Sequence, residues 1–527
     1  MNSKNIIYFL TAALLVIVMN RAVRAADPLP VLSEYFDMLE SSNLETALMM
    51  WTEENQERSS RFSIEYLDIP LKIDCSSPIV QNLELMRRFL YQPVRSYESL
   101  DHGAYASLEF SKMVGADLVE YTYYVKESGD YYWLIYPQDY FGRTWPVRES
   151  RYFRIHYHPD IGKYLNDVLL EEADRFVENT AKTLNISSAD VAVIADKKIE
   201  YYYCDSDETV KEITGQTTKG MFDLPSNDII SANFPHFHEL LHFLINYRLR
   251  RLPLFTLPII QEGMAVYYGG RWGKKPSALF DLGIYIYREG FIDIDSILTY
   301  RGFHNYSGAD ISYPVAEIFT AFLIDRLGQD KMFELYLTLS GKYRELDSLS
   351  VTDIQAKIMS ATGHEQWTDL IADFNKYLDH AVSGEGAASP GKVTSGKVVL
   401  EGSGFKVTED KTWLAFEFTS PHDKPLRGSL FFGYDQRLAG QHSPLFEEQY
   451  SLDSLPFNGY RFGVRFDRNE AGYYDYGTSE LVAKFIWGIT PLEGYYNEAD
   501  NTITIRFKKA IIGEKLPDFT KFEYLPL

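Results

Sequence analysis

The feature that most constrains the fold of this chain is a short apolar segment interrupted by four ionisable side chains. Residues 235–245 read Pro-His-Phe-His-Glu-Leu-Leu-His-Phe-Leu-Ile, which places His238, Glu239 and His242 among leucines and phenylalanines. Pro235 is suited to the first turn of a helix, and the apolar neighbours predict that this helix is buried. Two histidines in such surroundings are unfavourable unless something binds them.

The spacing of these residues is typical of a metal site. Residues four apart lie on one face of a helix, so His238 and His242 can bind a single ion. Glu239 lies beside that face, where it can accept a proton from a water molecule. A catalytic zinc site needs a third protein ligand. Residues 258–268 predict a second apolar helix, and its only acidic residue is Glu262. We therefore expect one Zn2+ per chain, bound by His238, His242 and Glu262.

These motifs resemble those of a known family. The His-Glu-Leu-Leu-His motif at residues 238–242, followed at the thermolysin-like interval by Glu-Gly-Met-Ala-Val-Tyr at residues 262–267, is similar to the gluzincin metallopeptidases. The resemblance is strongest to the peptidase-MA-like domains of bacterial exported proteins, and it covers residues 149–381. It implies hydrolysis of peptide bonds through a metal-activated water, with His238, His242 and Glu262 as zinc ligands and Glu239 as general base.

The chain departs from the family in two places. Residues 220–223 read Gly-Met-Phe-Asp rather than the Gly-Met-Glu-Asn element of the aminopeptidase branch, so specificity for a free amine is unsupported. The acid that thermolysin-like enzymes carry four residues after the third ligand is Val266 here, which leaves the hydrogen-bond partner that would orient the histidines unidentified. Residues 219–223 still resemble the edge strand that can pair with an extended substrate.

A donor beyond the metal usually stabilises the negative charge that grows on a carbonyl oxygen under attack. Residues 313–327 predict an apolar helix that begins at Tyr313. Tyr313 resembles the tyrosine of the Tyr-x-x-Gly element in the aminopeptidase branch, with Ala316 in place of the glycine. The resemblance makes Tyr313 the expected oxyanion donor, and His304 and Tyr306 in the preceding segment are the alternatives.

Other polar motifs predict no second site. His156 and His158 alternate on a predicted strand and are expected to form a surface or half-buried pair, because no third ligand is near them in the sequence. His236 is expected to point away from the metal-binding face. Residues 269–275 read Gly-Gly-Arg-Trp-Gly-Lys-Lys, which lacks the spacing and the Ser or Thr of a phosphate-binding loop.

The expected fold class is multidomain α+β. Residues 28–146 predict helices followed by an antiparallel hairpin, a small α+β domain with a cystatin-like layout as one candidate. Residues 149–382 predict a mainly helical, zincin-like catalytic domain with a small mixed sheet. Residues 383–397 are rich in Gly, Ser and Pro and predict a linker. Residues 398–527 predict short strands, as in a β-sandwich. Within the helical part, Thr352 and Gln355 have capping-box spacing.

The N-terminus predicts export. Lys4, an apolar run over residues 6–18 and small residues near position 25 form the pattern of a secretory signal peptide over residues 1–25. The run is short for a membrane span, and a single N-terminal anchor is the alternative. We expect a periplasmic or extracellular mature protein with no stable membrane span.

Charge and cysteines restrict the partners. The net charge of −22 disfavours nucleic acid as a partner. The resemblance to the metallopeptidases implies a peptide or protein substrate. Cys75 and Cys204 could form a disulfide or remain two buried thiols. The alternative function is a non-catalytic zincin scaffold that binds through its β-rich C-terminal domain, and a zinc hydrolase acting on something other than protein also stays open.

Overall fold

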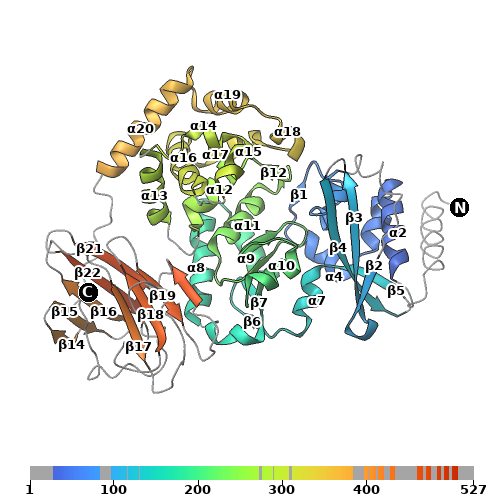
Figure 1. The fold of residues 1–527 in the computed structure, drawn as a ribbon, viewed down its shortest axis with the longest axis horizontal. Helices are drawn as coiled ribbons and strands as arrows, with labels where there is room; N and C mark the ends of the chain where they lie inside the picture. The colour runs from blue at the N-terminus through green and yellow to red at the C-terminus, as the bar shows by residue number, and fades with distance from the viewer. Residues whose placement is uncertain are drawn as a thin grey trace. The chain divides into compact units, whose positions relative to one another are not determined.

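A computed structural model describes most of the chain from residue 28 to residue 508 as a mixture of helices and several small sheets (Figure 1). The described residues are 28–82, 96–114, 117–129, 131–165, 167–271, 276–288, 290–307, 311–383, 397–402, 404–410, 413–419, 428–433, 460–466, 471–475, 484–487, 492–497 and 501–508. The predicted signal peptide and nearly all of the predicted linker lie outside them.

The described chain forms two compact units. The first unit contains the residues up to Pro159 together with Ala192–Asn233 and Leu249–Leu254. The second contains Asp160–Val191, Phe234–Arg248 and the residues from Phe255 onward. The first unit therefore includes residues on both sides of the domain boundary expected near residues 146–149, and the domain boundaries stay predictions.

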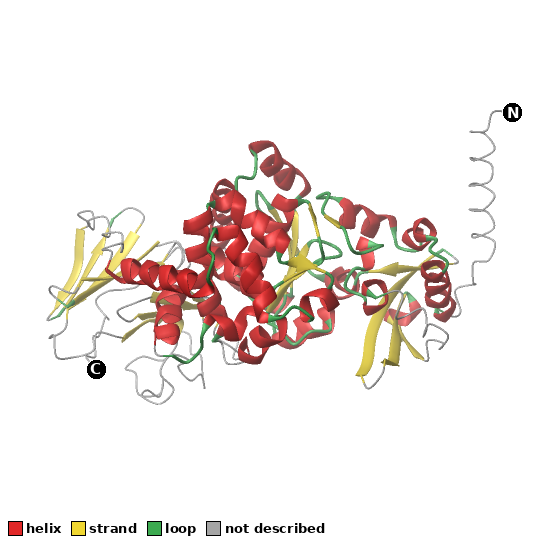
Figure 2. Ribbon diagram, turned by 90° about the horizontal axis from the view of Figure 1, so that it is seen from above, coloured by secondary structure: helices red, strands yellow, loops and turns green. Residues whose placement is uncertain are grey.

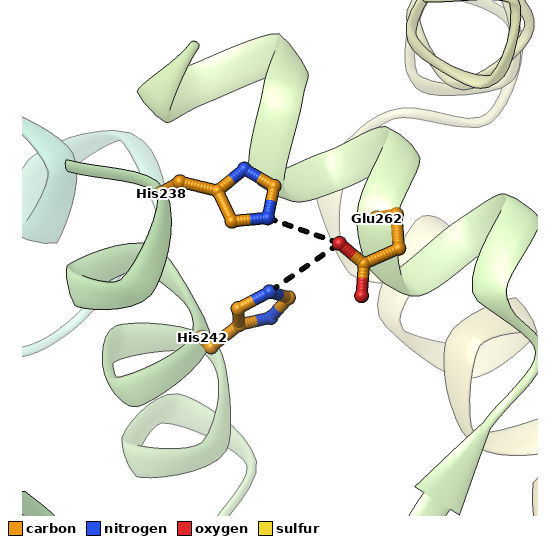
Figure 3. Close-up of side chains that lie close together, drawn as sticks. All are labelled: His238, His242 and Glu262. Atoms are coloured by element: carbon orange, nitrogen blue, oxygen red, sulfur yellow. Dashed lines mark hydrogen bonds and ion pairs between the residues drawn. The ribbon is translucent and has the colours of Figure 1, made fainter. Parts of the chain in front are cut away.

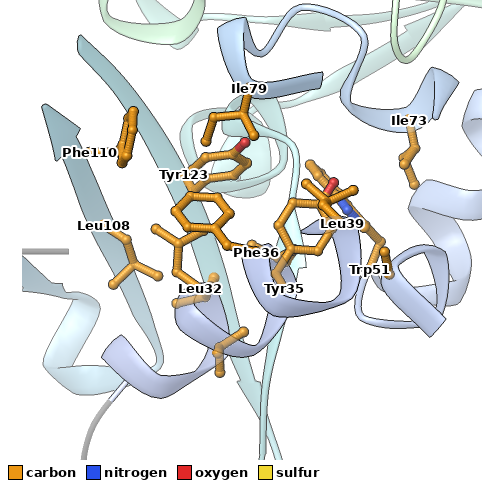
Figure 4. Packing of buried hydrophobic residues seen from close by; sticks show 14 of the residues in the cluster. Leu32, Tyr35, Phe36, Leu39, Trp51, Ile73, Ile79, Leu108, Phe110 and Tyr123 are labelled. Carbon is orange, nitrogen blue, oxygen red and sulfur yellow. The ribbon is translucent and has the colours of Figure 1, made fainter. Parts of the chain in front are cut away.

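The N-terminal part of the first unit is a helical layer packed on an antiparallel sheet. The helices are α2 (Leu29–Glu40), α3 (Leu44–Met49) and α4 (Glu53–Ser60), and the sheet has the order β2 (Ser96–Leu100), β3 (Tyr105–Val114), β4 (Asp117–Ser128), β5 (Tyr131–Ile135). The apolar residues of α2 recur every three or four positions and meet alternate residues of β3 and β4 (Figure 4). The aromatic-rich strands β4 and β5 form the hairpin that the sequence predicts.

A second sheet of the first unit is mixed. Its order is β6 (Val147–Glu149), β7 (Phe153–Tyr157), β8 (Ile199–Tyr203), β10 (Asp228–Ser231), β9 (Gly220–Asp223). Strands β7, β8 and β10 are parallel, and β9 is an antiparallel edge strand. The unit also contains α7 (Pro137–Phe141), α10 (Asp207–Thr214) and the short parallel pair β1 (Glu65–Tyr66) and β11 (Arg251–Leu252).

The second unit is mainly helical up to Ser383 (Figure 2). Its helices are α8 (Asp167–Thr183), α11 (Phe237–Leu249), α12 (Pro258–Gly269), α13 (Pro276–Arg288), α14 (Ile294–Leu298), α15 (Tyr300–Ser307), α16 (Ser312–Leu327), α17 (Gln329–Thr338), α18 (Tyr343–Asp347), α19 (Val351–Thr362) and α20 (Trp367–Ser383). The helix α9 (Ser188–Lys197) runs from the second unit into the first. Helix α16 is the central helix of this unit, here called the hub helix, because it contacts α12, α13, α14, α15, α17, α19 and α20.

Beyond Ser383 the described residues form two antiparallel sheets, in line with the β-rich character predicted from the sequence. One has the order β14 (Lys397–Gly402), β15 (Phe405–Glu409), β16 (Trp413–Thr419), β22 (Thr502–Lys508), β21 (Leu492–Asn497). The other has the order β17 (Gly428–Gly433), β18 (Tyr460–Phe466), β19 (Ala471–Asp475), β20 (Lys484–Trp487). Their assembly into a sandwich stays a prediction.

Two smaller expectations can be compared with the structure. Cys75 and Cys204 are both buried and are not joined by a disulfide, in agreement with the two-thiol alternative. No helix within the described residues is long and apolar enough to cross a membrane.

Candidate metal centre

Helix α11 brings the two histidines of the motif onto one face. His238 and His242 are one helical turn apart, and their rings are 4.9 Å apart between centroids. The opposite side of the helix is anchored in the core by Leu240, Leu241 and Leu244, which are fully buried. A buried helix with two polar positions on one face thus directs both imidazoles to the same point.

Helix α12 supplies the third side chain. It begins at Pro258, as predicted, and carries Glu262 one turn later. The next residue is Gly263, where an added Cβ would lie 2.7 Å from the carbonyl oxygen of Ala316 in α16. This close approach leaves no space for a larger residue, and it fixes α12 against the hub helix with Glu262 directed towards α11.

The three donor atoms converge (Figure 3). Oε2 of Glu262 lies 3.0 Å from Nε2 of His238 and 3.7 Å from Nε2 of His242. One ligand atom from each residue lies within 4.8 Å of the other two. Ligand atoms around one tetrahedral zinc ion are roughly 3.3 Å apart, given metal–ligand distances of about 2.0–2.2 Å. The three residues therefore fit a single ion with little rearrangement.

The orientation of His238 is fixed from its other ring nitrogen. Nδ1 of His238 lies 3.0 Å from the carbonyl oxygen of Gly270, immediately after α12. With the proton on Nδ1, this hydrogen bond leaves the lone pair of Nε2 directed at the convergence point, as in many metal-binding histidines. Val266 stands at the position of the missing family acid, and its side chain cannot accept a hydrogen bond. The backbone carbonyl of Gly270 accepts the hydrogen bond from His238 instead.

The charges of the centre are strongly coupled. Burial by itself would raise the pKa of Glu262, but the adjacent His242 and His238 outweigh it and hold this pKa well below its usual value. Burial would lower the pKa of His242, yet the charge of Glu262 raises it overall. An ionised carboxylate facing two imidazoles is a ligand set suited to a divalent cation.

Glu239 and His236 lie beside the convergence point without belonging to it. Glu239 is largely buried, and its Oε1 is 3.8 Å from Nδ1 of His236. Burial lowers the pKa of His236 to about 4, so this imidazole is neutral at pH 7. A neutral histidine leaves the carboxylate of Glu239 available as a proton acceptor.

Tyr313 is placed near the histidines by the start of α16. Its ring centroid is 6.4 Å from that of His238 and 5.2 Å from that of Phe303. Of the two alternatives, His304 has a largely exposed side chain. Partial desolvation of its ring lowers its pKa, although the charge of Glu262 acts to raise it. Tyr306 is also exposed, and the structure gives it no ring contact with the histidines within the described residues.

Arg271 is a site residue that the sequence analysis did not single out. Its Nη1 is 3.4 Å from Nε2 of His238 and 4.0 Å from Oε2 of Glu262. Its guanidinium carbon lies 3.4 Å from the ring centroid of Tyr313. Arg271 follows two glycines that end α12, and those glycines were the only signal that the chain turns back towards α11.

The remaining candidates lie elsewhere. Nε2 of His156 is 2.7 Å from Oε2 of Glu200, and its ring stacks on Tyr202. His158 packs edge-on against Trp145. Neither histidine belongs to a metal-binding cluster among the described residues, where His238, His242 and Glu262 form the only such group. The segment predicted to pair with substrate contains the edge strand β9, and its use in binding stays a prediction.

No protein-family model, curated protein or solved structure matches this chain in the three comparisons.

Proposed function

We propose that the protein is an exported, zinc-dependent metallopeptidase of the gluzincin type. The observation that carries the proposal is the convergence of His238, His242 and Glu262, whose ligand atoms lie within 4.8 Å of one another. Two imidazoles and a carboxylate, with Glu239 one residue after the first ligand, are the residue types that a hydrolytic zinc site requires.

Each residue has a distinct part in the proposed reaction. A zinc ion held by the three ligands would lower the pKa of a water molecule to about 7 and polarise the scissile carbonyl. Glu239 accepts the proton that the attacking water loses and passes it to the leaving amine. The ring of Tyr313 lies beside that of His238, with 6.4 Å between centroids, and its hydroxyl contributes to stabilising the carbonyl oxygen. Gly270 keeps His238 in the tautomer that binds metal.

The zincin-like architecture is part of this proposal. It is supported by the two ligand-bearing helices α11 and α12, whose apolar residues are buried, and by the packing of α16 against α12. The proposed export depends on residues 1–25 alone. Sequencing the N-terminus of the protein recovered outside the cytoplasm should give a start close to residue 26, and a retained Met1 would contradict cleavage.

The test combines metal analysis with a peptide-library cleavage assay on the purified mature chain. The wild type should bind about one zinc per chain and cleave peptides. Glu239→Gln should keep its zinc while kcat falls by roughly 10²- to 10⁴-fold, the scale of general acid–base catalysis. Glu334→Gln, an exposed acid of α17, is the matched control and should behave as wild type.

Two outcomes would count against the proposal. Zinc binding without cleavage by the wild type would favour the scaffold function. Cleavage that survives undiminished in Glu239→Gln would remove Glu239 as the base.

A further inference from the structure

The turn after α12 is built to bring one side chain back to the histidines. At Gly269 an added Cβ would lie 2.8 Å from the carbonyl oxygen of Phe237 and 3.0 Å from the backbone nitrogen of His238. The backbone of the turn thus touches the start of α11 directly. Gly270 adopts a positive φ of 72°, which favours glycine, and its carbonyl accepts the hydrogen bond from His238. Arg271 is the next residue.

The aromatic ring of Tyr313 holds the Arg271 side chain in place. The guanidinium lies over this ring at 3.4 Å from its centroid, a close cation–π contact. The arginine side chain is only 25% exposed. It is therefore partly desolvated and directed inward, with Nη1 at 3.4 Å from the metal-facing nitrogen of His238.

By itself, the positive charge of Arg271 beside His238 disfavours the binding of a metal ion. A divalent ion at the three ligands would lie within a few ångströms of the guanidinium, and like charges repel strongly at that distance in a partly buried site. The arrangement becomes favourable when an anionic oxygen lies between the two cations and interacts with both. Arginine is well suited to this, because its N–H groups form charge-assisted hydrogen bonds with oxyanions.

The distance also identifies which oxygen Arg271 can reach. Successive residues of an extended peptide are about 3.3–3.6 Å apart. A donor beside the ligand atom of His238 reaches the group at the convergence point itself, rather than a terminal carboxylate one or more residues further along a substrate.

We propose that Arg271 is a further oxyanion-binding residue of the site and that the ring of Tyr313 is its positioning support. The inference rests on the proposed function. When the water oxygen bonds to the carbonyl carbon, its proton passes to Glu239 and the carbonyl π pair moves onto the carbonyl oxygen. Arg271 donates an N–H to that oxygen. The pair on the oxygen then re-forms the C=O bond as the C–N bond breaks, and the nitrogen keeps the electron pair of the broken bond and takes the proton from Glu239.

The test uses inorganic phosphate, a small tetrahedral oxyanion that makes no demand on substrate preference. The mature chain is loaded with cobalt(II), and phosphate is titrated while the visible absorption of the metal is followed. Phosphate should bind the wild type and perturb its spectrum. In Arg271→Gln its affinity should fall roughly 10- to 100-fold, the size of one or two lost charge-assisted hydrogen bonds. Arg271→Lys should fall between them, because it keeps the charge and loses the fork.

Variants of Tyr313 separate its ring from its hydroxyl. Tyr313→Phe keeps the surface under the guanidinium and removes only the hydroxyl, so its loss of phosphate affinity measures the part of the hydroxyl alone. Tyr313→Leu removes that surface and should weaken phosphate nearly as much as Arg271→Gln does. Arg301→Gln is the matched control, since this arginine lies in the same unit and is 80% exposed. Cobalt should bind to all five variants, and circular dichroism should show the same melting profile.

Several outcomes would overturn the inference. These are a wild type that binds cobalt but no phosphate, an unchanged phosphate affinity in both Arg271→Gln and Arg271→Lys, or a loss in Tyr313→Leu no larger than that in Tyr313→Phe. A failure of the proposed function looks different. Phosphate binding that depends on Arg271 in a protein that cleaves no peptide would keep the anion site and reject the peptidase.

Discussion

The cluster around Asp228 in the first unit and the cluster around Glu262 in the second both bury ionisable side chains, but they surround them with different partners. Asp228 is fully buried, with its two oxygens 3.3 Å from Arg58 and 2.6 Å from Arg61. Arg58 also lies 2.6 Å from Asp139. In the second unit, a carboxylate and two imidazole nitrogens point at one another, and all three can act as metal ligands.

The two arrangements have different consequences. Burial would raise the pKa of Asp228, but Arg58 and Arg61 lower it overall, so the carboxylate stays ionised within a set of opposite charges. In such a network each buried charge is paired with an opposite charge of the same chain, and the pairs help to stabilise the fold. In the second unit the metal-binding atoms of three side chains point at one position, and a bound cation would satisfy them better than they satisfy one another. We infer a structural part for the Asp228 cluster and a metal-binding part for the Glu262 cluster.

The largest expected effect on stability follows from breaking the first cluster. Asp228→Ala leaves the guanidinium groups of Arg58 and Arg61 buried without their shared carboxylate. Unfolding free energy should fall by about 3–5 kcal/mol, the usual result of removing one partner of a buried ion pair. Denaturant unfolding measures this change. Glu54→Ala is the control, because Glu54 also pairs with Arg58 but is 78% exposed, and it should cost at most about 1 kcal/mol. Equal losses in both variants would contradict the structural part of the cluster.

A second prediction uses Asp74, a buried acid of the first unit that forms no ion pair with an arginine among the described residues. Burial raises its pKa to about 7, against the lowering effect of the hydrogen bonds that Tyr123 and Tyr35 donate. Between the ordinary pKa of about 4 and this value, the folded protein keeps a proton that the unfolded chain has lost. Stability should therefore fall as pH rises from about 4 to 7, at up to about 1.4 kcal/mol per pH unit.

Asp74→Asn keeps the shape of the side chain and removes its titration. Thermal unfolding at pH 5 and pH 7 should show a smaller difference between the two pH values in this variant than in the wild type. Parallel pH profiles for the two proteins would show that other groups govern the dependence.

A third prediction concerns the edge of the metal centre. Tyr313→Phe keeps the ring and loses the hydroxyl, so kcat should fall roughly 10- to 1000-fold if that hydroxyl stabilises the oxyanion. Zinc content and melting temperature should be unchanged. An unchanged kcat, with His304→Ala or Tyr306→Phe impaired instead, would move this role to α15.

The smallest expected effect separates the first-unit histidines from the centre. His156→Ala removes one hydrogen bond to Glu200 and a stacking contact with Tyr202. It should destabilise the protein by about 1–2 kcal/mol and leave the zinc content intact. Loss of zinc in His156→Ala would break the contrast between the two clusters.

The sequence predicted those parts of the molecule that local patterns specify. Helices α12 and α16 begin and end within two residues of their predicted limits, because proline, glycine and apolar periodicity mark them. Helix α11 begins at Phe237, so Pro235 lies two residues before it and not in its first turn as predicted. The capping box was wrong: Ser350 and Asp353 form it, two residues before the predicted pair of Thr352 and Gln355. Both pairs have similar spacing, and only the position of the helix start distinguishes them.

The tertiary contacts of these residues could not be predicted from the sequence. Asp228 pairs with Arg58 across 170 residues of chain, and no local pattern connects them. The partner of His238 is the backbone carbonyl of Gly270, which carries no side-chain signal. Arg271 belongs to the site because a glycine turn packs against α11, whereas its sequence context indicated only a rejected phosphate loop. These contacts depend on how helices meet rather than on which residues are neighbours.

Zinc content of two single variants tests the central claim most directly. Metal analysis of purified Glu262→Ala should find most of the zinc lost, with affinity reduced by more than about 100-fold, because a three-ligand site cannot hold the ion well with two. His238→Ala and His242→Ala should behave alike. His236→Ala, which alters a half-buried histidine immediately before the same helix, should keep about one zinc per chain. Full zinc retention in Glu262→Ala, or equal loss in His236→Ala, would contradict the proposed centre.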